Sequence, residues 1–281
     1  MRTVGEALVR AHQAAAAHSE TPALDAQVLV AEILGRSRAW VLAHGEEEIA
    51  TVEASAIQCA LLRCREGEPL PYIIGWWEFF GRRFRVSSAT LIPRPETESL
   101  VELALETLRG VIREKRAADI GTGSGCIAVT LAAEIEAVRV VATDTSGAAL
   151  RIAKMNAVDH EVEARVFFVR CDLLKGLEGG YDVVCGNLPY IPTGELVRLP
   201  VSRWEPRLAL DGGIDGLQFL RRLLTDLPRK LNAGGIALLE IGESQSDLAA
   251  ALARQSLPGW GIQVQKDLAG RPRVLRIGQG R

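Results

Sequence analysis

The chain of 281 residues has few cysteines and histidines, and these are not spaced as a disulfide framework or a metal site requires. The five cysteines are odd in number and include no Cys-x-x-Cys pair, while the four histidines are scattered. Free cysteines are typical of proteins that stay in a reducing compartment. We therefore predict a cytoplasmic protein without a metal ion.

A long apolar run and an excess of basic residues are also missing. No run of roughly 18 apolar residues, the length that crosses a bilayer, occurs, and residues 1–6 lead into an amphipathic segment instead of a signal-peptide core. Both observations disfavour a membrane protein. The net charge of -2 provides no global positive field to attract a nucleic acid, so nucleic acid could bind only through a local basic patch. Hydrophobic residues make up 48% of the chain, which is ample for a packed core.

The beginning of the chain is patterned as helices. Apolar side chains recur at helical spacing from Val4 onwards. Thr21 and Pro22 predict an N-cap and a first-turn proline for a second helix, which ends at Gly35. Further helical patterns follow, and the last ends at Gly67. We expect a small helical bundle here, with a role in recognising the substrate.

The pattern changes after this bundle. Around Gly81 it alternates as in a β-hairpin, and strand and helix patterns then alternate to the end of the chain. This predicts an α/β fold with a mostly parallel sheet covered on both faces, and its last two strands are too close in sequence for anything but an antiparallel pair. The expected domains are 1–71 (helical), 72–93 (hairpin linker) and 94–281 (α/β), with strands at 117–120, 138–143, 164–169, 183–185, 236–241, 262–265 and 274–277.

A glycine-rich turn follows the first strand of the predicted sheet. Its glycines allow a tight turn that a ligand can approach closely. Asp144 ends the next strand, where a carboxylate can accept hydrogen bonds from both hydroxyls of a ribose. A ligand that carries a nucleoside is therefore expected. The predicted binding residues are Asp119, Gly121, Thr122, Gly123, Ser124, Gly125, Asp144, Asp172, Leu173 and Asn187.

Two ligand classes compete for this turn. A dinucleotide site has the spacing G-x-G-x-x-G, whereas this turn has G-x-G-x-G with Asp119 just before it. A carboxylate there repels a pyrophosphate but attracts a cationic amino acid group. S-adenosylmethionine therefore fits better, and a reversed last strand agrees with a class I methyltransferase sheet. Asp172 is expected at the adenine amino group and Leu173 against the ring.

The tetrad Asn187-Leu188-Pro189-Tyr190 directly follows an apolar strand pattern. An amide, a rigid proline and an aromatic face together suit the binding of a planar NH2 group. We expect Asn187 Oδ1 and the carbonyl of Leu188 or Pro189 to accept one hydrogen each, while Tyr190 covers the plane. Asn187, Pro189 and Tyr190 are the predicted catalytic residues, and Leu188 is a further substrate-binding residue.

Together with this tetrad and turn, further stretches of the chain carry a family pattern, at 68–73, 91–98, 204–210, 239–242 and 267–271. The chain closely resembles the release factor glutamine methyltransferases, which modify the glutamine of the Gly-Gly-Gln motif in class 1 peptide chain release factors and so tune translation termination. The most specific stretch is Pro93-Arg94-Pro95-Glu96-Thr97-Glu98. The resemblance implies S-adenosylmethionine as the cofactor and a release factor as the partner.

The stretch 94–97, at the start of the α/β domain, has two interpretations. Arg94, Glu96 and Thr97 are candidates for lining the substrate channel, or they form a salt-bridged turn between domains. The chain also departs from the family pattern. Leu188 replaces a usual proline, Leu173 a frequent aromatic residue, and the stretch 271–273 a usual acidic one.

Two other functions remain as alternatives. An amino-group methyltransferase acting on adenine or guanine would meet the same two hydrogens, but it needs base flipping, and no basic sequence-reading domain is evident. A non-catalytic S-adenosylmethionine-binding assembly factor would have no use for the intact tetrad. A protein substrate is therefore favoured over a nucleic acid.

Overall fold

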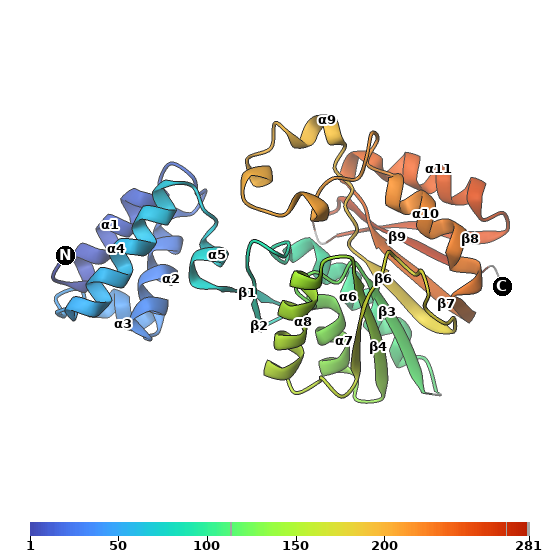
Figure 1. Cartoon of the computed structure of the whole chain (residues 1–281), viewed down its shortest axis with the longest axis horizontal. Helices are drawn as coiled ribbons and strands as arrows, with labels where there is room; N and C mark the ends of the chain where they lie inside the picture. Colours follow the sequence, from blue (N-terminus) through green and yellow to red (C-terminus); the bar gives the residue numbers. More distant parts are fainter. Residues whose placement is uncertain (113, 268, 280–281) are drawn as a thin grey trace. The chain divides into compact units, whose positions relative to one another are not determined.

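The computed structural model describes residues 1–112, 114–267 and 269–279. Leu268, which belongs to the family-like stretch 267–271, lies outside the described residues. Contacts between residues divide the chain into two compact units, Met1–Trp76 and Trp77–Arg281. Each unit has its own set of elements, as the labels in Figure 1 show.

The first unit is a bundle of helices, as predicted. Helix α1 packs against α2 and α4, and its N-terminus is capped by Thr3, whose side chain accepts from the Glu6 amide at 3.3 Å. Gly35 ends α2 with a φ of +59°, which a glycine adopts without strain. The helices are α1 (Val4–Ala15), α2 (Pro22–Leu34), α3 (Arg38–Ala43), α4 (Thr51–Arg65) and α5 (Leu70–Ile74).

The predicted start of α2 is confirmed, with Thr21 at the N-cap and Pro22 in the first turn. The side chain of Thr21 makes no capping hydrogen bond, because its backbone (φ -130°, ψ 55°) lies outside the extended region from which a cap reaches back. One local prediction for this part of the chain was wrong. The predicted hairpin segment begins with helix α5, whose start is fixed by Pro69 and Pro71, so the strands begin only at Trp76.

The hairpin consists of β1 (Trp76–Phe79) and β2 (Arg82–Arg85). The two residues between them, Phe80 and Gly81, have φ values of 53° and 67°, as a tight two-residue turn needs. The Phe80 amide donates to Glu98 Oε1 at 2.8 Å, which ties this turn to the start of α6 (Glu98–Arg109). The hairpin prediction is confirmed.

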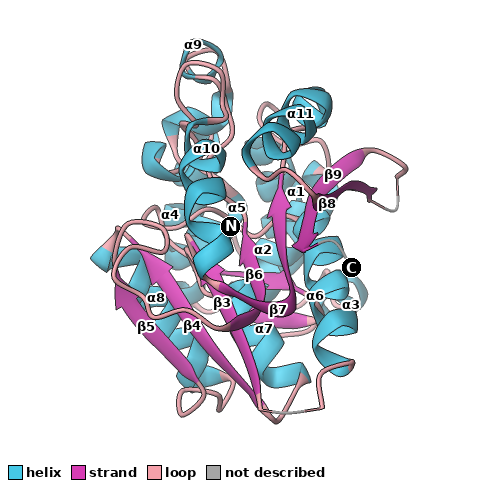
Figure 2. Cartoon of the chain, turned by 90° about the vertical axis from the view of Figure 1, so that its right-hand side faces the viewer, coloured by secondary structure: helices cyan, strands magenta, loops and turns pink. Residues whose placement is uncertain are grey.

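The second unit contains a seven-stranded sheet in the order β5-β4-β3-β6-β7-β9-β8 (Figure 2). Strand β9 lies between β7 and β8 and pairs with both in antiparallel fashion, while the other neighbours pair in parallel. The predicted mostly parallel sheet with a reversed last strand is confirmed. The strands are β3 (Lys115–Ile120), β4 (Val138–Asp144), β5 (Val166–Arg170), β6 (Tyr181–Gly186), β7 (Leu231–Glu240), β8 (Trp260–Lys266) and β9 (Pro272–Gln279).

Helices cover both faces of this sheet because consecutive strand residues point to opposite faces. Val183 of β6 packs in the hydrophobic cluster that contains residues of α6 and α7, whereas its neighbour Val184 packs in the cluster with α10 and α11. Both side chains are fully buried, and the burial of each stabilises the folded state by about 1.5–3 kcal/mol. The covering helices are α6, α7 (Cys126–Glu134), α8 (Gly147–Asp159), α10 (Gln218–Asp226) and α11 (Ser246–Ser256).

A longer connection leaves the sheet between β6 and α10. It contains α9 (Thr193–Leu196) and 3₁₀ turns at Pro200–Arg203 and Arg207–Ala209. The alternating strand and helix pattern did not predict these short elements. Because this connection starts at the carboxyl end of a central parallel strand, it is placed beside the edge where ligands bind in such sheets.

Candidate active site

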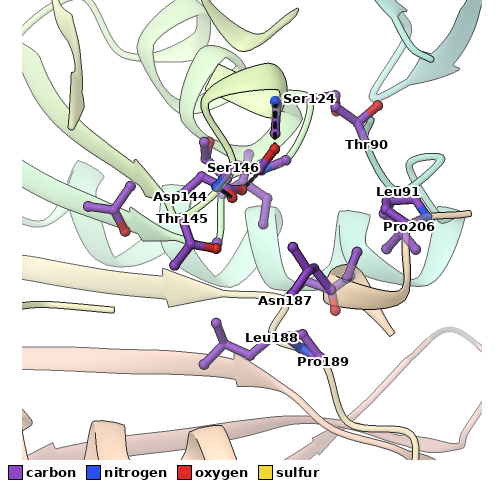
Figure 3. A pocket seen from close by; sticks show the side chains of 18 of the residues that line it. Thr90, Leu91, Ser124, Asp144, Thr145, Ser146, Asn187, Leu188, Pro189 and Pro206 are labelled. Carbon is purple, nitrogen blue, oxygen red and sulfur yellow. Dashed lines mark hydrogen bonds between the residues drawn. The ribbon is translucent and has the colours of Figure 1, made fainter. Parts of the chain in front are cut away.

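A cavity of about 550 Å³ lies at the carboxyl ends of the parallel strands. Its wall includes Gly121–Ser124 of the turn after β3, the end of β4 and the first three residues of the tetrad after β6. Figure 3 shows Asp144, Thr145 and Ser146 on one side of the cavity and Asn187, Leu188 and Pro189 on another. The fold thus brings the predicted donor and acceptor segments to one place.

The glycines of the turn are required for different reasons. Gly121, Gly123 and Gly125 have φ values of 72°, 55° and 82°, which residues with a side chain rarely adopt. A Cβ at Gly125 would also lie 3.0 Å from the Cβ of Ala153 in α8, so this glycine permits close packing of two helices. Gly121, Thr122, Gly123 and Ser124 line the cavity, whereas Gly125 supports them from outside its wall.

Asp144 is held in place by the turn that it faces. Its Oδ2 accepts from the Gly123 amide at 3.0 Å, and its Oδ1 accepts from the Ser146 amide at 2.8 Å. Each carboxylate oxygen keeps a further lone pair. Asp144 lines the cavity, so it can accept hydrogen bonds from a vicinal diol such as that of a ribose.

Asp119 differs from its predicted position. It is fully buried behind the turn and does not belong to the cavity wall, where direct contact with a ligand was expected. Its Oδ2 accepts from Thr122 Oγ1 at 2.6 Å and from the Ala128 amide at 3.2 Å, so it joins the turn to the start of α7. Burial raises the pKa of Asp119 to about 7. Asp119 thus supports the glycine-rich turn from behind, and its contact with a ligand stays a prediction.

The side of the cavity expected to hold a nucleobase contains both predicted residues. Leu173 is buried in the wall with a φ of 53°, and its carbonyl accepts from Thr143 Oγ1 at 3.2 Å. The carboxylate of Asp172 also lines the cavity and forms an ion pair with Arg222. Phe219 lines the same cavity, an aromatic side chain that sequence reasoning missed because α10 is far away in the chain.

The tetrad is anchored by a chain of hydrogen bonds. Asn187 Nδ2 donates to Thr97 Oγ1 at 3.1 Å, and Thr97 Oγ1 donates to Glu240 Oε2 at 2.6 Å. The Tyr190 hydroxyl donates to Glu240 Oε1 at 3.3 Å. Asn187, Leu188 and Pro189 line the cavity, but Tyr190 lies outside its wall. The Tyr190 hydroxyl is thus directed to Glu240, and the cover of an NH2 group by its ring stays a prediction.

The backbone of the tetrad packs against the glycine-rich segment 212–216. Gln245 Nε2 donates to the Tyr190 carbonyl at 2.8 Å, and a Cβ at Gly216 would lie 2.1 Å from that oxygen. The Pro189 carbonyl oxygen is 2.8 Å from the position of a Cβ at Gly212. Sequence reasoning missed this segment and Gln245, although the run of glycines in 212–216 is a signal for close backbone approach.

The stretch 93–98 contributes unevenly to the site. Arg94 and Thr97 line the cavity, whereas Glu96 is exposed and lies outside its wall. Arg94 forms an ion pair with Glu205 at 2.5 Å, and buried Glu205 also accepts from the Ile92 amide at 3.1 Å. The salt-bridged turn therefore exists within the second unit. Glu205 is another residue whose role sequence reasoning did not identify.

Over residues 1–112, 114–267 and 269–279, no group of three or more His, Cys, Asp or Glu residues is arranged to hold a metal ion. Among the helices of this described part, none has the length and apolar character of a membrane span.

Comparison with known proteins gives close relatives over the full length of the chain. The family model described as "PrmC N-terminal domain" matches residues 6–75, and "Methyltransferase small domain" matches residues 97–199. A release factor glutamine methyltransferase of Moorella thermoacetica is 43% identical over 276 residues, covering 98% of this chain and 96% of that protein. Its counterpart of Koribacter versatilis is 40% identical, covering 92% of each. A crystal structure of a methyltransferase from Pyrococcus furiosus shares the fold, with a TM-score of 0.52, 17% identity and coverage of 83% of this chain and 100% of that one.

Proposed function

The chain belongs to the release factor glutamine methyltransferase family, and we propose that it methylates the side-chain amide nitrogen of the glutamine in the Gly-Gly-Gln motif of class 1 release factors, with S-adenosylmethionine as the methyl donor. The observation that supports this most is the cavity in which Asp144 and the glycine turn face the same space as Asn187. A donor site and an acceptor for an NH2 group thus adjoin each other.

The residues present fit S-adenosylmethionine. The cavity volume of about 550 Å³ suits a nucleoside with an amino acid group. Asp144 would hold the ribose hydroxyls, the turn at Gly121–Ser124 would lie along the ligand, and Leu173 with Phe219 would contact the adenine. When bound, the sulfonium supplies a methyl group, to which the amide nitrogen bonds as the carbon–sulfur bond breaks and its electron pair stays on sulfur.

The enzyme acts mainly by positioning its substrate. An amide nitrogen is a poor nucleophile because its lone pair is delocalised into the carbonyl group. Asn187 Oδ1 would accept one amide hydrogen, and the Leu188 carbonyl would accept the other, since the Pro189 carbonyl packs against Gly212. Both hydrogen bonds strengthen as positive charge develops on the nitrogen. The nitrogen then releases one proton to solvent, which leaves a neutral N-methyl amide.

The test is transfer of label from methyl-labelled S-adenosylmethionine to a purified release factor. We expect labelled release factor, no labelled RNA, and no label on a release factor whose Gly-Gly-Gln glutamine is replaced by alanine. The variant Asn187→Ala should keep cofactor affinity and lose about 10²-fold in kcat, as is typical for loss of one oriented polar group. Label on RNA would support the nucleobase alternative, and no label on either would support the non-catalytic one.

A further inference from the structure

The hydrogen bonds behind the tetrad connect three segments that are distant in sequence. Asn187 follows β6, Thr97 ends the 3₁₀ turn Pro95–Thr97, and Glu240 ends β7. The distances are 3.1 Å from Asn187 Nδ2 to Thr97 Oγ1 and 2.6 Å from Thr97 Oγ1 to Glu240 Oε2. Thr97 is 2% exposed and Glu240 is 4% exposed. Bulk water therefore does not compete for the bond between Thr97 and Glu240, whereas the half-buried Asn187 lines the cavity.

The direction of each hydrogen bond follows from the donors that are present. An ionised carboxylate only accepts, and a threonine hydroxyl carries a single proton. The proton of Thr97 is therefore used by Glu240, and Thr97 can only accept from Asn187. Asn187 must turn its NH2 group to Thr97. Its Oδ1 is thereby directed away from Thr97 and remains available to a ligand in the cavity that Asn187 lines.

The second carboxylate oxygen of Glu240 also accepts a hydrogen bond, so both oxygens act as acceptors. Oε1 accepts from the Tyr190 hydroxyl at 3.3 Å. Burial and the adjacent Glu240 raise the pKa of Tyr190, so its hydroxyl stays protonated and donates. Burial raises the pKa of Glu240, and the hydrogen bonds from Thr97 and Tyr190 together with the positive charge of Arg273 offset part of this rise.

We propose that Glu240 is a positioning residue that, through Thr97, determines which end of the Asn187 amide faces the substrate. The inference rests on the proposed function, because only a substrate with an NH2 group needs an oxygen at this point. It explains how the site discriminates between side chains of the same shape. A glutamine side chain can donate a hydrogen bond to Asn187 Oδ1. A glutamate carboxylate cannot, because its oxygens would be repelled by Oδ1.

The main test uses Glu240→Gln, which keeps the shape of the side chain. Its amide can donate to Thr97, so that the hydroxyl turns and donates to Asn187 Oδ1. Asn187 then presents its NH2 group to the cavity. We expect kcat to fall roughly 10- to 100-fold, the loss for a misdirected polar group, while KM for S-adenosylmethionine stays within about twofold. Thr97→Val should behave similarly, and Thr97→Ser should recover most of the activity lost in Thr97→Val.

A binding measurement separates positioning from a merely structural role. The release factor is compared with a variant in which glutamate replaces the target glutamine, and both are titrated against the saturated S-adenosylhomocysteine complex of each enzyme. Wild type should bind the glutamine form more tightly. In Glu240→Gln, the ratio of the two affinities should shift toward the glutamate form by about 10-fold, as expected when one hydrogen bond is lost for the glutamine and one is gained for the glutamate. In the Asn187→Ala background, Glu240→Gln should leave the ratio unchanged.

The possible outcomes distinguish the inference from the proposed function. An unchanged glutamine-to-glutamate ratio in Glu240→Gln, with wild type methylating the release factor, overturns the positioning role alone. A wild-type enzyme that methylates no release factor overturns the proposed function instead. Thermal unfolding serves as the folding control. Glu240→Gln removes a buried charge, so its Tm should not fall by more than a few degrees, and a shifted ratio in a folded variant supports the inference.

Discussion

Asp119 shows how burial changes the task of a single side chain at this site. The pattern before the glycine turn predicted contact with a cationic ligand, yet the carboxylate is fully buried and binds Thr122 and the Ala128 amide. It therefore organises the turn from behind. A residue two positions from a binding loop can be essential to that loop without touching the ligand.

The raised pKa of Asp119 predicts a specific pH dependence of stability. Burial raises this pKa from 3.8 to about 7, so the neutral form is favoured in the folded state. Its stabilising contribution is complete below pH 3.8 and is lost as the pH rises through about 7. Relative to Asp119→Asn, which is neutral throughout, wild type should lose up to about 4 kcal/mol of unfolding free energy between about pH 4 and pH 8.

Urea unfolding of both proteins across this range measures the difference. Titration of other carboxylates affects both proteins equally and cancels. A difference that stays constant with pH would show that Asp119 titrates normally.

At the scale of elements, the site depends on the glycine-rich segment 212–216 between β6 and α10. The tetrad backbone lies so close to this segment that side chains cannot fit between them, as the 2.1 Å from a Cβ at Gly216 to the Tyr190 carbonyl shows. Gln245 at the start of α11 donates to the same carbonyl. The segment 212–216 and Gln245 thus hold the backbone of the tetrad.

Replacing Gly216 by alanine should displace the Tyr190 carbonyl and break its bond from Gln245. We expect a loss of about 1–3 kcal/mol in unfolding free energy together with a fall in kcat. Gly234→Ala is a matched control, because Gly234 has a similar φ of +76° but no atom within 4 Å of its Cβ position. Denaturant unfolding and turnover are measured for both variants. An effect of Gly216→Ala beyond that of Gly234→Ala is due to the steric clash, because both positions share the strain of a positive φ. Equal effects of the two substitutions would contradict the packing role.

At the scale of the whole molecule, the first unit carries no part of the cavity described above. It does expose large apolar side chains that its own core does not use, including Val52 at 75% and Leu62 at 53%, both on α4. Exposed apolar side chains on a helix are available for contact with a protein partner. We therefore propose that this helical unit contributes to gripping the release factor.

This proposal predicts a separation between the two substrates. Val52→Asp should raise KM for the release factor by roughly 3- to 10-fold, as for a moderate interface contact, and leave the Kd of S-adenosylmethionine unchanged. Gln58→Asp introduces the same charge on an exposed polar position of α4 and is the control. Steady-state kinetics with intact release factor measure the effect. Equal KM values for the two variants would exclude Val52 from the contact.

The sequence alone was sufficient for the strands of the main sheet and for the long helices, but not for α5, α9 and the 3₁₀ turns. Apolar runs such as that before Asn187 predict buried strands, and the reversed last strand followed from the short connection before it, because strand and helix periodicities are local properties of the chain. The glycine turn, Asp144 and the tetrad were also recognisable, since each combines residue types whose chemistry is specific. These features predicted the family and the proposed reaction.

Only the tertiary structure decided which of these residues meet and in which direction their side chains bond. Thr97 and Glu240 are 143 residues apart, and Asn187 is 90 residues from Thr97, yet they form one hydrogen-bonded chain. No local pattern encodes such a contact, because it depends on how strands order in the sheet and how connections pack over its edge. The burial of Asp119 and the hydrogen bond from Tyr190 to Glu240 were decided at the same level.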